Sequence, residues 1–276
     1  MVRSSSVFGR RSVVRQCQRG GKRLTRRSVK SAVARSQHLG ILNEMWDLSA
    51  QDLMAIKLSL KVATVAMLAT LPFAIAFGYI LARWQFRGKI VLDGLVQLPL
   101  VVPPVVTGYV LLLAFGRHGP IGAFLAQTFG IVFSFRWTGA ALAAAVMGFP
   151  LFVRATRLAI EAVDRRTEEA AATLGASPLW VFLTVTAPLS MQGIIAGALL
   201  CFAKALGEFG ATITFVSNIP GETQTIPSAI FSYTQTPGGD ASAITLSCIA
   251  IAISLIALVV SEILARRAWG REAHLA

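Results

Sequence analysis

Long stretches with almost no charged residue constrain this chain more than any other feature of its sequence. Four of them hold no Asp, Glu, Lys or Arg, and a fifth holds only Lys204 and Glu208. The five stretches are 62–81, 94–116, 138–153, 193–216 and 241–261. A helix needs about 20 apolar residues to cross the roughly 30 Å core of a bilayer. The sequence therefore predicts an all-α polytopic membrane protein with about five transmembrane helices.

The overall composition agrees with a membrane protein. Charged residues make up 14% of the chain, whereas they make up about a quarter of a soluble domain. A sixth apolar stretch, 121–135, is short and is interrupted by Gly122 and Gly130. We expect this stretch to be an interfacial or re-entrant segment rather than a span.

The distribution of basic residues predicts the orientation in the membrane, because cytoplasmic loops are enriched in Lys and Arg. The loops after the first and third spans, together with the C-terminal tail, hold ten basic residues, whereas the opposite side holds four. The loop 217–240 holds no Lys or Arg. We therefore expect the loop after the third span and the C-terminus to be cytoplasmic, and the first span to begin outside.

The N-terminal segment 1–44 differs in charge from the rest of the chain. It holds eleven Lys and Arg and one acid, a net +10, whereas residues 45–276 hold fifteen and twelve, a net +3. We interpret 1–44 as a disordered basic tail that is not part of the native protein if translation starts at Met45. A transit peptide is the alternative interpretation. Because the basicity belongs to the tail, we expect no nucleic-acid partner for residues 45–276.

The loop 159–188 predicts two short helices joined by a glycine turn. Asp164 is placed to cap a helix over 165–174, because its side chain can accept a hydrogen bond from a free N–H of the first turn. Gly175 follows the helix, at the position where a left-handed backbone commonly ends one.

The second short helix is predicted from Ser177 and Pro178, which suit a cap and a first helical position. We expect Pro188 to end this helix. Two interpretations remain open from these residues. The loop is either a docking element for a partner at the cytoplasmic face or a hairpin that packs against its own bundle.

The same loop resembles a known motif. Glu169-Ala-Ala-Ala-Thr-Leu-Gly175 is followed by Val185-Thr-Ala-Pro188. This resembles the EAA loop of ABC-importer permeases, which has E-A-A, three residues, G, nine residues and I-x-L-P. Val and Ala replace Ile and Leu here, and both keep these positions apolar. The resemblance implies that the loop docks on a cytoplasmic ATPase. The coupling residues would be Glu169, Ala170, Ala171, Gly175 and Pro188.

Three further segments resemble the molybdate permeases of bacterial ABC importers. They begin Phe202-Ala-Lys-Ala-Leu-Gly-Glu-Phe-Gly, Leu98-Pro-Leu-Val-Val-Pro-Pro and Ala143-Ala-Ala-Val-Met-Gly-Phe-Pro. The resemblance covers roughly residues 45–270. It implies a multi-pass permease domain, 45–276, in the bacterial inner membrane, surrounded by lipid and paired with a second copy of itself. It also implies cytoplasmic ABC ATPase subunits and a periplasmic molybdate-binding protein as partners.

Molybdate, moved by alternating access, is the substrate that the resemblance implies. Sulfate, thiosulfate or tungstate is the alternative within the same family. A membrane-anchored assembly protein is an alternative from another class, but it would need neither a broken span nor the EAA pattern.

The chain lacks motifs for chemistry of its own. A phosphate-binding loop ends in Gly-Lys-Ser/Thr, whereas here Gly21-Lys22 is followed by Arg and Gly88-Lys89 by Ile. The three histidines are scattered and form no ligand cluster. We therefore expect a transport subunit and not an enzyme. No cofactor would bind this chain, and ATP and Mg²⁺ would bind the partner ATPase.

Helix-breaking and charged residues within the spans are candidates for a translocation pathway or gate. Pro103 and Pro104 break the second span, and a broken helix is tolerated where protein or a water-filled cavity surrounds it. Lys204 and Glu208 lie four residues apart, so on one helix they would share a face and neutralise each other. A packed kink and a structural ion pair are the alternatives.

Threonines with hydroxyl groups come a few residues after the two prolines and after Glu208 in the sequence. They can donate hydrogen bonds to an oxyanion without holding it too tightly for release. Back-bonding within a helix is the alternative role. The predicted pathway or gate residues are Pro103, Pro104, Thr107, Glu208, Thr212 and Thr214.

Overall fold

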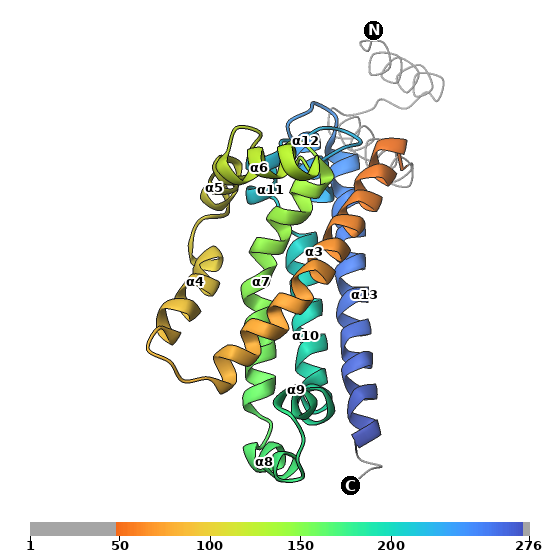
Figure 1. The fold of residues 1–276 in the computed structure, drawn as a ribbon. Coiled ribbons are helices and arrows are strands. Elements are labelled where there is room, and N and C mark those ends of the chain that lie inside the picture. The colour runs from red at the N-terminus through yellow and green to blue at the C-terminus, as the bar shows by residue number, and fades with distance from the viewer. Residues whose placement is uncertain (1–47, 273–276) are drawn as a thin grey trace, which may run out of the picture. The chain divides into compact units, whose positions relative to one another are not determined.

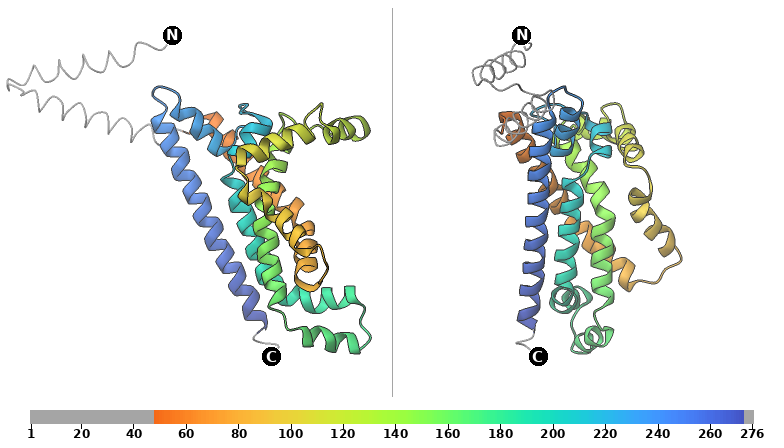
Figure 2. Two further views of the ribbon diagram at one scale, coloured as in Figure 1. Left: turned by 90° about the vertical axis from the view of Figure 1, so that its left-hand side faces the viewer. Right: turned by 180° about the vertical axis from the view of Figure 1, so that it is seen from behind.

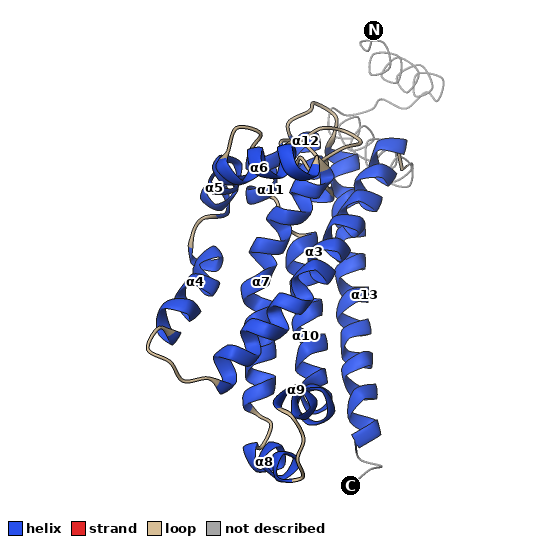
Figure 3. Cartoon of the chain, viewed as in Figure 1, coloured by secondary structure: helices blue, strands red, loops and turns tan. Residues whose placement is uncertain are grey.

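The structure is a computed structural model that describes residues 48–272. Every regular element in this range is a helix, as Figure 3 shows. The all-α prediction is therefore confirmed for this part of the chain. The predicted tail, 1–44, lies outside the described residues.

Three long helices form the packed centre of the bundle. They are α3 (Ala50–Arg83), α7 (Trp137–Glu161) and α10 (Ala187–Leu206). Small residues let their backbones approach closely, as is common in membrane helices. A Cβ added to Gly148 would lie 2.7 Å from the Cys201 sulfur. One added to Gly193 would lie 2.2 Å from the Ala159 Cβ. The small residues of α7 and α10 thus set the spacing of the centre.

The number of apolar helices agrees with the predicted number of spans. In the described range, four helices are long and apolar enough to cross a membrane. A bent pair, α4 (Lys89–Val101) and α5 (Pro104–Phe115), makes a fifth span if it is counted as one. The chain bends by 111° between the two. The predicted break at Pro103 and Pro104 is therefore present, and it is sharper than a kink in a continuous span.

The shorter elements lie at the two ends of the bundle (Figure 1). At one end lie α8 (Arg165–Thr173), α9 (Pro178–Val181) and the C-terminal end of α13 (Asp240–Glu272). At the other end lie α5, α6 (Pro120–Phe129), α11 (Gly210–Val216) and α12 (Ile226–Thr234). Figure 2 shows the same separation from two further sides. Below, the α8 end is called the inner end and the α6 end the outer end.

This arrangement agrees with the orientation predicted from the basic residues, because the loop after the third span and the end of α13 share the inner end. The helix α6 has ten residues, which is too short to cross a bilayer. Its length fits the predicted interfacial or re-entrant segment.

Cysteine labelling tests the orientation. The native Cys17, Cys201 and Cys248 are first replaced by Ala. In intact cells, Glu222→Cys, an exposed position between α11 and α12, should react with a membrane-impermeant thiol reagent. Arg166→Cys, exposed on α8, should react only after the cells are opened. A gel-shift assay reads both positions. Labelling of position 166 but not of position 222 in intact cells would contradict the five-span topology.

Candidate functional site

The predicted glycine turn is present at the inner end. Gly175 has φ of +88°, a left-handed conformation that glycine adopts without the steric cost of a Cβ. Its N–H donates to the Ala172 carbonyl at 3.0 Å, and the Ala176 N–H donates to the Ala171 carbonyl at 3.4 Å. These two bonds form a Schellman cap, which satisfies carbonyls that the end of α8 leaves free.

Both short helices begin at the predicted caps. The Asp164 carboxylate accepts from the Arg166 N–H at 3.0 Å, and the Ser177 hydroxyl accepts from the Trp180 N–H at 3.4 Å. Pro178 lies in the first turn of α9, where its missing N–H leaves no intrahelical bond unmade. Local sequence signals therefore explain the start of each helix.

The prediction that Pro188 ends the second helix is wrong. The chain passes from α9 through a π-helix (Phe182–Thr186) into α10 without leaving helical conformation. Pro188 lies in the first turn of α10. Figure 2 shows α9 running across the end of α10. The π-helix and the proline therefore bend the chain instead of terminating the helix, as both features commonly do.

Glu168 bonds the loop to the rest of the bundle, a role that the sequence did not reveal. Its Oε1 accepts from Arg83 Nη2 at 2.8 Å and from the Thr186 hydroxyl at 2.7 Å. Arg83 is the last residue of α3, and its Nη2 also donates to the Val163 carbonyl at 2.9 Å. The side chains of Arg83 and Glu168 are 9% and 16% exposed, respectively. The loop is thus joined to α3 and to the π-helix that leads into α10.

The outward face of the loop is open. Glu169 and Ala170 are exposed, Ala171 is half-buried, and α8 contains no buried residue. Large apolar side chains stand out from the turn and from α9 as well. They are Leu174, Leu179 and Trp180, which are 89%, 68% and 61% exposed. Apolar groups that gather on an exposed surface commonly mark an interaction site. This observation favours the docking element over a hairpin that only packs on its own bundle.

The two helix breaks meet towards the outer end. A Cβ added to Gly210 of α11 would lie 2.8 Å from the Pro104 Cβ of α5. One added to Gly108 of α5 would lie 2.5 Å from the Ala211 carbonyl oxygen and 2.9 Å from the Thr214 Cβ. The backbones of α5 and α11 therefore pack directly against each other. The fold brings together predicted pathway residues that lie far apart in the sequence.

Glu208 does not share a helix with Lys204, contrary to the prediction. The helix α10 ends at Leu206, and α11 begins at Gly210. The ion pair nevertheless forms, because Lys204 Nζ donates to Glu208 Oε2 at 2.9 Å. The other oxygen, Oε1, accepts from the Ala211 N–H at 3.0 Å. The carboxylate, which belongs to a residue only 3% exposed, therefore satisfies a free N–H at the start of α11 and complements its dipole.

The predicted hydroxyl groups fall into two kinds. The Thr214 hydroxyl donates to the Gly210 carbonyl at 2.8 Å, which is the back-bonding alternative. Thr107 on α5 and Thr212 on α11 are buried, at 9% and 3% exposure. Pro103 stands immediately before the start of α5. The pathway or gate role of these residues stays a prediction.

A metal site is not apparent in the part of the chain that the structure describes. No group of three or more His, Cys, Asp or Glu side chains within residues 48–272 is placed to hold an ion.

Sequence comparison places the chain among transport proteins. It is 58% identical to the molybdenum transport system permease protein ModB of Escherichia coli over 212 residues, which are 77% of this chain and 93% of that protein. The ModB protein of Haemophilus influenzae is 55% identical over 78% of this chain and 94% of its own length. The chloroplastic sulfate permease 2 of Chlamydomonas reinhardtii is 40% identical over 70% of this chain and 54% of its own length.

Solved structures share the fold. An inward-facing form of the MetNI methionine ABC transporter matches with a TM-score of 0.64 and 12% identity, over 80% of this chain and 99% of that one. A bacterial ABC transporter that imports alginate also matches with a TM-score of 0.64, at 15% identity, over 84% and 89%. Residues 74–270 match the family described as binding-protein-dependent transport system inner membrane component. The chain belongs to this family of inner membrane transport components, which are not enzymes.

Proposed function

We propose that this chain is the permease subunit of an ATP-driven importer that moves molybdate across the inner membrane by alternating access. The observation that carries the substrate is the 58% identity to a molybdenum permease over 93% of its length. The sulfate permease shares fewer positions, 40%, over 54% of its length. This difference favours molybdate over sulfate or thiosulfate. Tungstate should also be transported, because molybdate and tungstate are tetrahedral anions of nearly the same size.

The importer would contain a second copy of this chain, cytoplasmic ABC ATPase subunits and a periplasmic molybdate-binding protein. The ATPase subunits would bind ATP and Mg²⁺, since this chain has no phosphate-binding loop. The exposed surface of Glu169, Ala170, Leu174, Leu179 and Trp180 would dock on the ATPase. Its mixture of charge and apolar area suits a protein partner.

The contacts described above form a continuous route from the docking loop to the helix breaks. Glu168 bonds α8 to Arg83 and Thr186, and the π-helix that contains Thr186 leads into α10. The other end of α10 carries the Glu208 cap of α11, and α11 packs on α5. Movement of the loop by the ATPase would therefore displace α10 and change the contact between α11 and α5. This contact would act as the gate.

The charge of Glu208 bears on its role in the pathway. A free carboxylate would repel an oxyanion, but this one is already paired with Lys204 and with the Ala211 N–H. Glu208 would therefore hold the gate in shape and would not touch the anion. The buried hydroxyls of Thr107 and Thr212 are the groups that could donate to a passing oxyanion.

Reconstitution tests the substrate. The full transporter in liposomes should show ATPase activity that rises when molybdate-loaded or tungstate-loaded binding protein is added. The activity should rise little when sulfate is added with the binding protein. Uptake of the same anions, measured by elemental mass spectrometry, should follow this order. A response to a sulfate-loaded binding protein with none to the molybdate-loaded form would overturn the assignment.

The turn at Gly175 tests the docking role. Nothing lies within 4 Å of a Cβ added there, so a new side chain meets backbone strain and no steric clash. Gly175→Val should cost about 1–2 kcal/mol locally, because a left-handed backbone is unfavourable for a β-branched residue. It should leave membrane abundance unchanged, reduce co-purification of the ATPase and abolish uptake.

Gly175→Asn is the matched control, because Asn tolerates the left-handed conformation. It should retain both ATPase binding and uptake. A Val variant with normal co-purification and normal uptake would refute the docking role. A Val variant that only lowers membrane abundance would support the self-packed hairpin.

The two neighbouring acids should behave differently. Glu168→Ala removes the acceptor of Arg83 and Thr186, and a lost hydrogen bond to a charged group costs about 1–3 kcal/mol. The melting midpoint of the purified permease should fall. Glu169→Ala changes an exposed residue, so the midpoint should stay unchanged while less ATPase co-purifies. Equal midpoints for the two variants would contradict the anchoring role of Glu168.

A further inference from the structure

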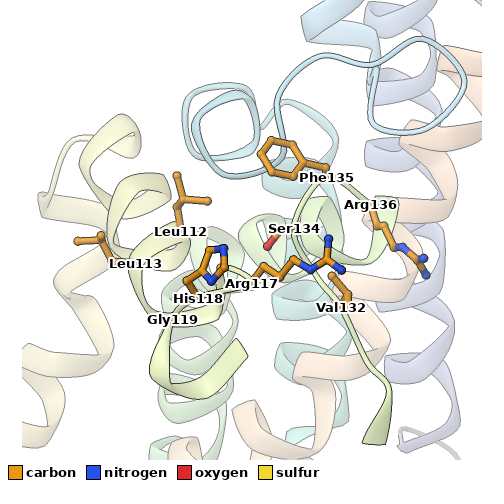
Figure 4. Close-up of a pocket in the computed structure, with 10 residues that line it drawn as sticks. Leu112, Leu113, Arg117, His118, Gly119, Val132, Ser134, Phe135 and Arg136 are labelled. Carbon is orange, nitrogen blue, oxygen red and sulfur yellow. The ribbon is translucent and has the colours of Figure 1, made fainter. Parts of the chain in front are cut away.

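A pocket of about 710 Å³ lies at the outer end, apart from the loop and the helix breaks. It is formed by the end of α5, the turn after it and the segment that leads into α7. Figure 4 shows Arg117 and His118 in the middle of the pocket, and Ser134 belongs to its wall. Arg136 also lines it, but its guanidinium points away from these three groups in the same view.

The polar groups of this pocket lack partners within the described chain. Ser134 is 7% exposed, and its hydroxyl makes no hydrogen bond to any described residue. Arg117 and His118 are exposed, and no Asp or Glu occurs between Asp93 and Glu161. The pocket therefore offers donors and positive charge with no carboxylate of its own segment to neutralise them.

The pocket lies at the level where a span meets water. Arg136 stands immediately before α7, and Trp137 is its first residue. The Lys61 ammonium of α3 lies 3.5 Å from the centroid of the Trp137 ring. Aromatic and basic residues at the end of a span typically mark the headgroup region of the bilayer. Arg117 and His118 are thus placed at headgroup depth.

Apolar side chains form the remaining wall. Leu112 and Leu113 of α5, together with Val132 and Phe135, line the pocket beside the charged groups. A single hydrated oxyanion would leave this wall uncovered and most of the volume empty. A ligand that joins a phosphate to an apolar body covers both parts.

We propose that this pocket binds the phosphate group of an anionic phospholipid from the outer leaflet. The Arg117 guanidinium donates to the phosphate oxygens, and His118 lies beside it as a further donor. Leu112 and Leu113 contact the glycerol and the upper acyl chain. Binding holds the end of α5 at the membrane surface.

Native mass spectrometry of the full transporter in detergent tests the proposal. Phosphatidylglycerol is titrated, with phosphatidylethanolamine as the zwitterionic comparison. The wild-type protein should retain phosphatidylglycerol preferentially. Arg117→Gln should bind it about tenfold more weakly, as expected when a charge-assisted hydrogen bond is lost. Lys57→Gln is the matched control, because it removes one exposed positive charge from α3 outside the pocket, and it should bind like the wild type.

A second measurement needs no variant. A photoactivatable phosphatidylglycerol should label wild-type peptides that contain residues 112–119 or 132–136. Labelling elsewhere, or equal retention by the Arg117 variant and the control, would overturn the proposal. So would displacement of the lipid by an excess of inorganic phosphate, which would make this a site for a free oxyanion. Unchanged lipid retention with a lost ATPase response to loaded binding protein would instead make the pocket a protein-docking surface.

Discussion

The bilayer offers no hydrogen-bond partners, and this constraint governs how the chain can break its helices. A helix end at membrane depth leaves N–H and C=O groups that protein atoms must satisfy. At the start of α11, Glu208 accepts the Ala211 N–H and is itself neutralised by Lys204. At the start of α5, Pro103 and Pro104 bring no N–H groups at all. Each break is thus made tolerable by the residues that stand at it.

Because the breaks are satisfied locally, the two short helices after them are free to pack on each other. The close approach of Gly108 to Ala211 and of Gly210 to Pro104 follows from small side chains at the contact. A larger residue at either glycine would force α5 and α11 apart. The tight contact near the outer end therefore depends both on capping at the breaks and on small residues beyond them.

At the inner end, the bonds of one carboxylate hold the loop helix α8 in place. The polar helix α8 has no buried residue of its own, so apolar burial does not hold it. The shielded bonds of Glu168 to Arg83 and Thr186 hold it instead. This leaves the apolar side chains of the turn and of α9 exposed for a partner. The helix α10 connects the two ends, since it starts beside the loop and finishes beside the capped break.

Local signals in the sequence determined the caps at Asp164, Gly175 and Ser177, because such signals act between residues at most a few positions apart. Long uncharged stretches determined the apolar helices. The prediction for Pro188 failed because the π-helix before it kept the chain helical. Only the tertiary structure decided that Glu168, and not Glu169, anchors the loop, and that Glu208 caps a second helix. It also decided that the two breaks meet. The physical reason is that the partners in these contacts, such as Arg83 and Glu168, lie many positions apart, and packing alone selects them.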